Sequence, residues 1–161
     1  IIINNTNITE IRENQSNKKF PKEVFFDSID NEETLILSGT HNGYLNKYKK
    51  VCKRELLVHK KMNLIKGEDI IISSKSNFEK TIYHIRFHLM PGISTTVTEN
   101  KKNVIMKTAK NNMWVFKSND EILIEKSIYV NNDIALESSQ IVITGVTNSL
   151  KSRIQWSLEQ I

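Results

Sequence analysis

Three side chains that can bind an anion alternate along one predicted strand. The stretch Thr81 to Leu89 alternates apolar and polar residues. His84, Arg86 and His88 share one face of it, about 7 Å apart at each step, because successive strand residues face opposite sides. A guanidinium flanked by two imidazoles suits a carboxylate or a sulfate and is a poor site for a cation. These three are therefore candidate substrate-binding residues, although an exposed polar strand face would explain the same pattern.

A second candidate group is the run His41-Asn42-Gly43-Tyr44. It combines an imidazole that titrates near neutral pH, a turn that tolerates positive φ, and a phenol. His41 and Tyr44 are therefore candidate catalytic residues. The same run also fits a tight turn in which Tyr44 packs against the fold and His41 bonds to the backbone.

The more familiar catalytic signatures are absent from the sequence. It has no glycine-rich phosphate loop, no Gly-x-Ser-x-Gly elbow, no His-Glu-x-x-His and no Cys-x-x-Cys. Cys52 is the only cysteine, so neither an intrachain disulfide nor a cysteine-rich zinc site can form. Glu68-Asp69, which follows Gly67, is interpreted as a turn rather than a metal site. We predict no metal and no cofactor in this chain.

The charge of the chain permits binding to polyanions. Its 23 Lys and Arg residues outnumber its 18 Asp and Glu residues, which gives a net charge of +5. Acidic polysaccharide and nucleic acid are both attracted to such a surface. We predict no nucleic acid, because aromatic residues are not interleaved with an arginine-rich patch. Trp114, Phe116 and Trp156 can stack on sugar rings, but in alternating strands they are more typical of a core.

The elements that would position these residues are short strands. Hydrophobicity alternates with a period near two, between turn signals such as Asn42-Gly43, Asn111-Asn112 and Asn131-Asn132. The predicted strands are Ile1–Asn4, Glu23–Asp27, Thr34–Thr40, Leu45–Lys49, Lys53–Lys60, Asp69–Ser73, Thr81–Leu89, Ser94–Thr98, Asn103–Lys107, Met113–Lys117, Glu121–Val130, Gln140–Thr144 and Arg153–Leu158. Thr6–Lys19 is predicted to be a loop. The pattern predicts an all-β, antiparallel two-sheet sandwich forming a single domain over residues 1–161.

No apolar run approaches the roughly 18–20 residues that cross a bilayer. Ile1 to Thr9 also lack the layout of a signal peptide. We therefore predict no membrane contact. Because the chain begins inside a predicted strand, we expect it to be a piece of a longer protein.

Several runs, in this order, resemble those of one enzyme family. They are Ser38-Gly39-Thr40-His41-Asn42-Gly43-Tyr44, Arg54-Glu55-Leu56, Gly67-Glu68-Asp69, Arg86-Phe87-His88-Leu89-Met90-Pro91-Gly92, Trp114-Val115-Phe116, Glu125-Lys126-Ser127-Ile128-Tyr129, Gln140-Ile141-Val142-Ile143-Thr144-Gly145 and Ile154-Gln155-Trp156-Ser157-Leu158. Together they are similar to the heparinase II/III-like polysaccharide lyases, in the forms common in proteobacteria. Met90 and Asn42 depart from the family pattern, which often has histidine and aspartate there.

The resemblance implies a parent enzyme with an N-terminal helical toroid and a C-terminal, supersandwich-like β-sandwich. An acidic polysaccharide such as a glycosaminoglycan would lie between them and undergo β-elimination at a uronic acid. In the family, the catalytic tyrosine comes from the helical domain, and the histidines and divalent-metal ligands come from strands that would precede Ile1. The resemblance therefore implies a fragment that is inactive alone, from a protein of the periplasm or cytoplasm of a Gram-negative bacterium.

Two functional hypotheses remain open at this point. The first is the C-terminal sandwich of a lyase, which scaffolds the helical domain of its parent. The second is a stand-alone carbohydrate-binding module in which His84, Arg86 and His88 hold an acidic glycan. The resemblance favours the first hypothesis, and a titration with acidic oligosaccharides would discriminate between them.

Overall fold

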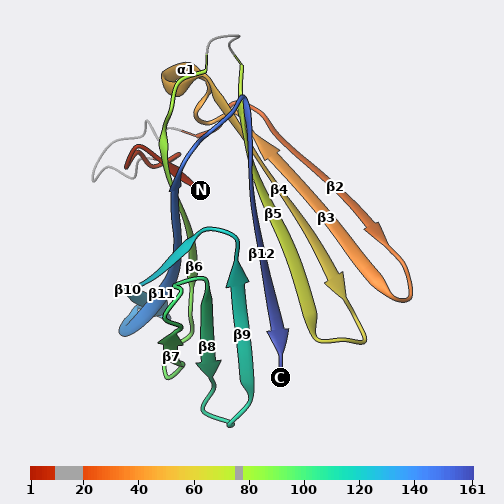
Figure 1. The fold of residues 1–161 in the computed structure, drawn as a ribbon, viewed down its shortest axis with the longest axis vertical. Helices are drawn as coiled ribbons and strands as arrows, with labels where there is room; N and C mark the ends of the chain where they lie inside the picture. The colour runs from red at the N-terminus through yellow and green to blue at the C-terminus, as the bar shows by residue number, and fades with distance from the viewer. Residues whose placement is uncertain (10–19, 75–77) are drawn as a thin grey trace.

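Two antiparallel β-sheets pack face to face in the computed structural model of the chain (Figure 1). The structure describes residues 1–9, 20–74 and 78–161. The smaller sheet has the spatial order β1 (Ile2–Ile3), β6 (Ile82–His88), β11 (Ile134–Val146) and β10 (Glu121–Asn131). The larger sheet has the order β2 (Val24–Asp30), β3 (Thr34–His41), β4 (Lys50–His59), β5 (Leu64–Ser73), β12 (Lys151–Gln160), β9 (Met113–Ser118), β8 (Asn103–Lys107) and β7 (Ser94–Val97). The prediction of an all-β, antiparallel two-sheet sandwich is confirmed.

Alternation of apolar and polar residues explains why these segments form strands. In β12, Ile154 and Trp156 are buried, whereas Arg153 and Gln155 between and beside them are exposed. In β6, Tyr83 and Ile85 are buried on the opposite face from the polar residues. β6 and β12 therefore each present one apolar face to the space between the sheets.

The last strand of the chain lies in the middle of the larger sheet. β12 pairs with β5 from Lys151 to Glu159 and with β9 from Trp156 to Gln160. The strands β2 to β5 lie on one side of it, and β7 to β9 lie on the other. β12 therefore joins two groups of strands that share no pairing with each other.

One predicted strand is wrong. Helix α1 (Leu45–Tyr48) occupies the place where the sequence pattern predicts a strand over Leu45–Lys49. Tyr44 and Tyr48 lie one helical turn apart, with ring centroids 6.2 Å from each other, and burial of the Tyr44 ring anchors this turn. Lys49 ends the helix in the left-handed conformation, with a φ of 53°.

The interpretation of Glu68-Asp69 as a turn is also wrong. β5 begins at Leu64, and both residues lie inside it, paired with β4 and β12 on either side. Gly67, which suggested a turn, is required here by packing. A Cβ atom at that position would lie 2.2 Å from Cζ2 of Trp156, so only glycine lets the indole ring lie flat on the strand.

The turn between β10 and β11 lies one residue beyond its predicted place. Asn132 and Asp133 form it, and both have positive φ, as a two-residue hairpin turn of type I′ requires. This turn continues the pairing of β10 and β11 well past the residues that pair with β6, so the hairpin extends beyond the rest of its sheet. Most of the predicted loop Thr6–Lys19 lies outside the described residues.

The core lies between the sheets and contains apolar side chains from both. Its buried members are Ile3, Tyr44, Cys52, Ile71, Tyr83, Ile85, Val104, Met106, Phe116, Ile122, Ile141, Ile143, Ile154 and Trp156. Phe87 of the smaller sheet contacts Phe116 and Trp156 of the larger sheet, at centroid distances of 4.9 and 4.7 Å. Phe116 and Trp156 are therefore core residues, as predicted, and Trp114 is half-buried beside them.

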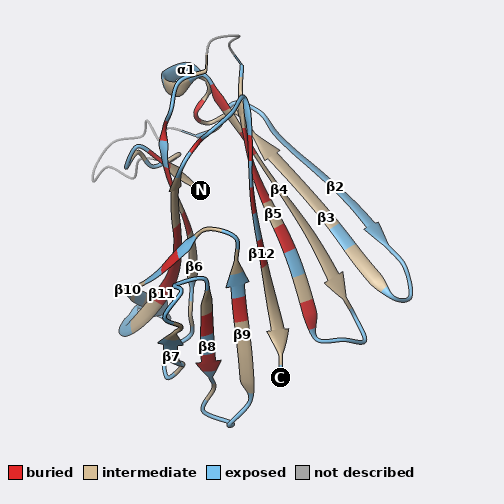
Figure 2. Cartoon of the chain, viewed as in Figure 1, coloured by how far each residue is buried: buried red, intermediate tan, exposed pale blue. Residues whose placement is uncertain are grey.

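The smaller sheet leaves the edge of the larger sheet uncovered. Every residue of β2 is exposed, and Figure 2 shows this strand exposed over its full length. Its apolar side chains include Phe25, at 66% exposure, and Phe26, at 70%. No helix in the described part of the chain has the length and apolar character needed to span a membrane.

Candidate functional site

His41 and Tyr44 lie close together, but the contacts of Tyr44 indicate a structural role. Their ring centroids are 5.9 Å apart. The Tyr44 side chain is 2% exposed, and its hydroxyl shares its one proton between the Ile1 carbonyl, at 3.0 Å, and the Thr6 carbonyl, at 2.9 Å. Burial raises the pKa of this phenol well above its usual range. Tyr44 therefore attaches the beginning of the chain to the sandwich and keeps its proton.

His41 lines a small cavity at the end of β3. Its Nδ1 accepts a hydrogen bond of 3.3 Å from the Gly43 backbone N–H, so the neutral ring carries its proton on Nε2. Burial lowers the pKa of the imidazole below its usual value. The cavity has a volume of about 290 Å³, and Arg54 and Asp69 contribute to its wall. Among the predicted catalytic residues, His41 is the one beside a cavity.

His84, Arg86 and His88 share the outer face of the smaller sheet. The alternate residue Phe87 points into the core, so these three point away from it. Arg86 forms an ion pair with Glu125, which also accepts a 3.1 Å hydrogen bond from Nε2 of Gln140. The predicted anion site therefore already contains a carboxylate.

The two histidines of this face differ in their surroundings. Nδ1 of His88 lies 2.8 Å from Oγ of Ser127 in a hydrogen bond. Nδ1 of His84 is buried and has no hydrogen-bond partner within the described residues. The structure does not bring this face together with His41, because His41 pairs with the buried Cys52 on the inner face of the larger sheet. The predicted roles of the three residues stay predictions.

Sequence reasoning missed a buried charged cluster between the sheets. Asp69, with 0% exposure, accepts hydrogen bonds from Nε of Arg54 at 2.8 Å and from Nη2 at 2.9 Å. Nε1 of Trp156 donates to the same carboxylate at 2.9 Å. The guanidinium also lies over the rings of Phe87 and Trp156, 5.2 and 5.7 Å from their centroids. This cluster links three strands of one sheet to the other sheet.

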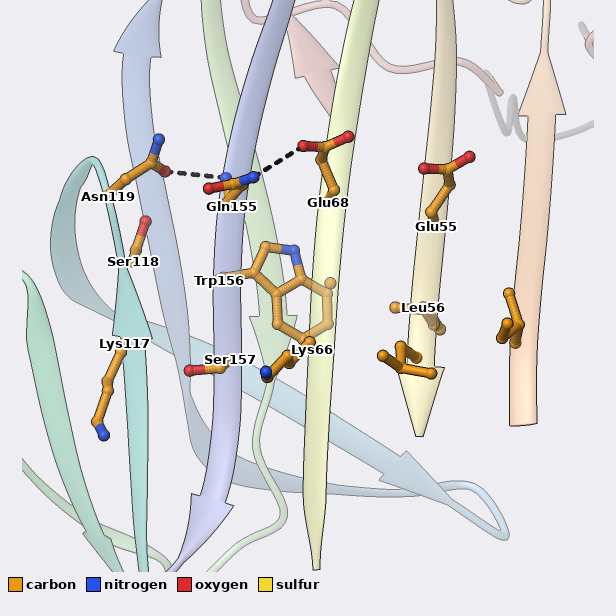
Figure 3. A pocket seen from close by; sticks show the side chains of 13 residues that line it. Glu55, Leu56, Lys66, Glu68, Lys117, Ser118, Asn119, Gln155, Trp156 and Ser157 are labelled. Carbon is orange, nitrogen blue, oxygen red and sulfur yellow. Dashed lines mark hydrogen bonds between the residues drawn. The ribbon is translucent and has the colours of Figure 1, made fainter. Parts of the chain in front are cut away.

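On the opposite, outer face of the same strands lies a groove of about 730 Å³ (Figure 3). Its polar lining comes from several strands, and it includes Lys66 and Glu68 of β5 and Gln155 of β12. Nε2 of Gln155 donates to Oε1 of Glu68 at 3.1 Å, and the Gln155 backbone N–H donates to Oδ1 of Asn119 at 2.9 Å. The groove is therefore lined by groups that already form hydrogen bonds with one another.

Comparison of the chain with models of known protein families identifies its family. A family model described as "Heparinase II/III-like, C-terminal" matches residues 1–157. The chain belongs to this family. The resemblance of its sequence runs to the heparinase II/III-like lyases is thereby confirmed. A sequence search of curated proteins returned no match.

Solved structures of a heparan sulfate lyase and of heparinases III share the fold of this heparinase II/III-like chain. Heparan sulfate lyase HepC from Pedobacter heparinus has a TM-score of 0.69 and 11% identity, over 86% of this chain and 22% of that chain. A heparinase III with methylated lysines has a TM-score of 0.70 and 8% identity, over 89% and 22%. Another heparinase III has a TM-score of 0.56 and 12% identity, over 84% and 21%. This chain therefore spans about a fifth of the length of these proteins.

Three of the sequence runs that resemble the family lie side by side in the heparinase II/III-like fold. Arg54 is the register partner of Asp69. Leu56 is the partner of Gly67, which in turn pairs with Trp156. The run that contains Trp156, 87 residues after Asp69, therefore forms one patch with two runs that are close to each other in the sequence. The presence of all three in the family-like series was the signal that could have pointed to them.

The described residues do not fit a metal ion. No group of three or more His, Cys, Asp or Glu side chains gathers within residues 1–9, 20–74 and 78–161 in a way that could hold one. The side-chain amide of Asn42, at the position where the family often has aspartate, donates to Glu23 at 2.9 Å and so holds the turn. We therefore derive no catalytic step through a metal.

Proposed function

We propose that this heparinase II/III-like chain is the β-sandwich domain of a polysaccharide lyase and does not cleave glycans by itself. The family match over residues 1–157 carries the proposal. Similarity in fold to solved heparan sulfate lyases supports it. Because the chain spans about a fifth of such a protein, the rest of the parent would contribute the catalytic centre.

β-Elimination by the proposed parent requires particular catalytic groups. In β-elimination a base removes the proton at C5 of a uronic acid, and the electron pair forms a double bond between C4 and C5. The bond from C4 to the glycosidic oxygen breaks, and an acid protonates that oxygen. A cation or hydrogen-bond donor must also neutralise the uronate carboxylate.

Several contacts support inactivity of the chain alone. The Tyr44 hydroxyl is bound to backbone carbonyls and has a raised pKa, which removes it as a base. Arg86, one of the three residues predicted to hold an anion, is already paired with Glu125. We therefore assign the base, the acid and neutralisation of the reacting uronate carboxylate to the remainder of the parent, together with any divalent metal site.

An absorbance assay for unsaturated uronate tests this proposal. The parent protein should cleave an acidic polysaccharide, whereas the 161-residue chain should show no turnover. Tyr44→Phe in the parent should change the rate by less than about threefold, because loss of a catalytic acid or base costs about 10²–10⁴-fold. Turnover by the chain alone, or a hundredfold loss in a folded Tyr44→Phe parent, would contradict the proposal.

The partners we propose are an acidic polysaccharide and the N-terminal helical domain of the same parent. The exposed strand β2 supports a partner domain, because Phe25 and Phe26 are apolar and more than half exposed. Phe26→Ser should weaken binding of a separately produced helical domain in calorimetry. The matched variant Ile128→Ser, at an equally exposed residue of the β10–β11 hairpin, should not. Equal effects of the two variants would contradict this placement.

A further inference from the structure

The groove on the outer face of the larger sheet contains a row of cationic and hydroxyl groups. Ser157 of β12 is the register partner of Lys66 on β5 and of Lys117 on β9. Neighbouring strands lie about 4.8 Å apart, so the two lysine backbones lie about 10 Å apart with the serine between them. Figure 3 shows these three side chains in the lower part of the view, below Gln155 and Glu68. This row offers two positive charges and one hydroxyl to a ligand.

A second row, two residues further along the same strands, contains carboxylates and an amide. Glu55, Glu68 and Gln155 are neighbours in register across β4, β5 and β12. Glu55 forms a 2.6 Å ion pair with Lys53, and Glu68 forms an ion pair with Arg153. The negative charges of this row are therefore balanced by cations, and their free lone pairs can accept hydrogen bonds from hydroxyl groups.

The lysines of the first row are less strongly ion-paired than the carboxylates of the second row. Lys66 is exposed and makes no ion pair within the described residues. Lys117 lies 3.2 Å from Glu159, in a pair whose side chains are 51% and 40% exposed. Such exposed pairs contribute little free energy, about 0–1 kcal/mol, so a ligand anion can replace the glutamate.

Apolar residues continue the first row toward the edge of the sheet. Leu57 is the register partner of Lys66, and Ile36 is the partner of Leu57, so the groove extends across β3, β4, β5, β12 and β9. Five neighbouring strands span about 19 Å at the usual spacing. The groove is therefore elongated, with an apolar end, and suits an extended chain of rings.

We propose that this groove binds an acidic oligosaccharide. Lys66 and Lys117 bind its carboxylate or sulfate groups, and Glu55, Glu68 and Gln155 form hydrogen bonds with its ring hydroxyls. The inference rests on the proposed function for the glycan class, and it adds a binding surface on the face of the larger sheet that points away from the smaller sheet. This surface would hold the polysaccharide while the rest of the parent cleaves it.

Calorimetric titration of the 161-residue chain tests the proposal, with a sulfated, uronate-containing hexasaccharide as the probe. The double variant Lys66→Gln and Lys117→Gln should bind about tenfold more weakly, which corresponds to about 1.4 kcal/mol. The control double variant Lys110→Gln and Lys126→Gln removes the same charge from exposed positions outside the groove and should bind within twofold of the unmodified chain. Binding should also weaken as salt rises.

An NMR measurement identifies the surface independently. The side-chain amide signals of Gln155 and Asn119 should shift on addition of the hexasaccharide. Equal weakening in both double variants, tight binding of a neutral hexasaccharide, or unshifted amide signals would overturn the proposal. The absorbance assay on the parent separates the two claims, because a parent that cleaves while its chain fails to bind contradicts the groove alone.

Discussion

Replacing Arg54 by methionine should destabilise the chain by about 3–5 kcal/mol, the usual cost of leaving one partner of a buried ion pair alone. The Asp69 carboxylate is 0% exposed, and within residues 1–9, 20–74 and 78–161 two of the three side-chain hydrogen bonds that it accepts come from Arg54, at 2.8 and 2.9 Å. Methionine keeps the length of the side chain and its packing over Phe87 while it removes the charge. The loss therefore reports mainly on the unpaired carboxylate.

Replacing Asp69 instead of Arg54 should lower the free energy of unfolding by a smaller amount. Asp69→Leu leaves the guanidinium of Arg54, whose side chain is 35% exposed and can be partly hydrated, and leaves the Trp156 N–H without its acceptor. We expect a loss of about 1–3 kcal/mol for an unsatisfied buried polar group. The double variant removes both charges and should be more stable than Arg54→Met alone, because an apolar replacement of a buried pair is often neutral.

Urea unfolding followed by circular dichroism measures these differences, with the slope m as a check on two-state behaviour. In a chain of this size, a loss of 3–5 kcal/mol lowers the melting temperature by roughly 6–20 °C. A cost below about 1 kcal/mol for Arg54→Met would refute the reasoning. The reasoning would also be refuted if the double variant lost as much free energy of unfolding as the two single variants together, since residues in direct contact should be coupled.

Three further outcomes follow from the packing. Gly67→Ala should lower the free energy of unfolding by about 1–3 kcal/mol, because the new Cβ overlaps the Trp156 ring. Gly39→Ala should change the melting temperature little, because a Cβ atom there would have no neighbour within 4 Å. Equal changes in melting temperature for the two variants would contradict the packing argument. Cys52 is 1% exposed and burial raises its pKa to about 12, so thiol reagents should label it only after unfolding, and rapid labelling of the folded chain would be inconsistent with this. Because burial lowers the pKa of His41, the unfolded state binds a proton first as the pH falls below about 6.5, and stability should decrease between pH 7 and pH 5. His41→Gln should flatten that decrease in urea midpoints, and an unchanged slope would exclude this residue as its source.

The fold class could be predicted because period-two alternation is a local property of the sequence. The alternation from Thr81 to Leu89 separates core from surface as the structure does. The pattern failed at Leu45–Lys49, where the residues must reverse the chain between β3 and β4 and form helix α1. The alternation pattern also predicted a strand over Gln140–Thr144 only. In the structure, pairing with β10 along the hairpin extends β11 to Ile134–Val146.

The site depended on strand order, which local patterns do not contain. Arg54 and Asp69 are close in sequence, but Trp156 joins them only because β12 lies between β5 and β9. The groove could not be predicted for the same reason. For His41 and Tyr44 the structure agrees with the alternative of a tight turn, with the ring bonded to the backbone and the phenol packed inside.

The central position of β12 also has a consequence for synthesis of the protein. Strands β2 to β5 leave the ribosome before β12, so the free edge of β5 cannot be covered until residues 151–160 have been made. At about 5–20 residues per second, the ribosome needs roughly 4–17 s to finish β12 after finishing Ser73. During this interval the nascent chain has an unpaired strand edge, of the kind that pairs with other chains and that chaperones protect.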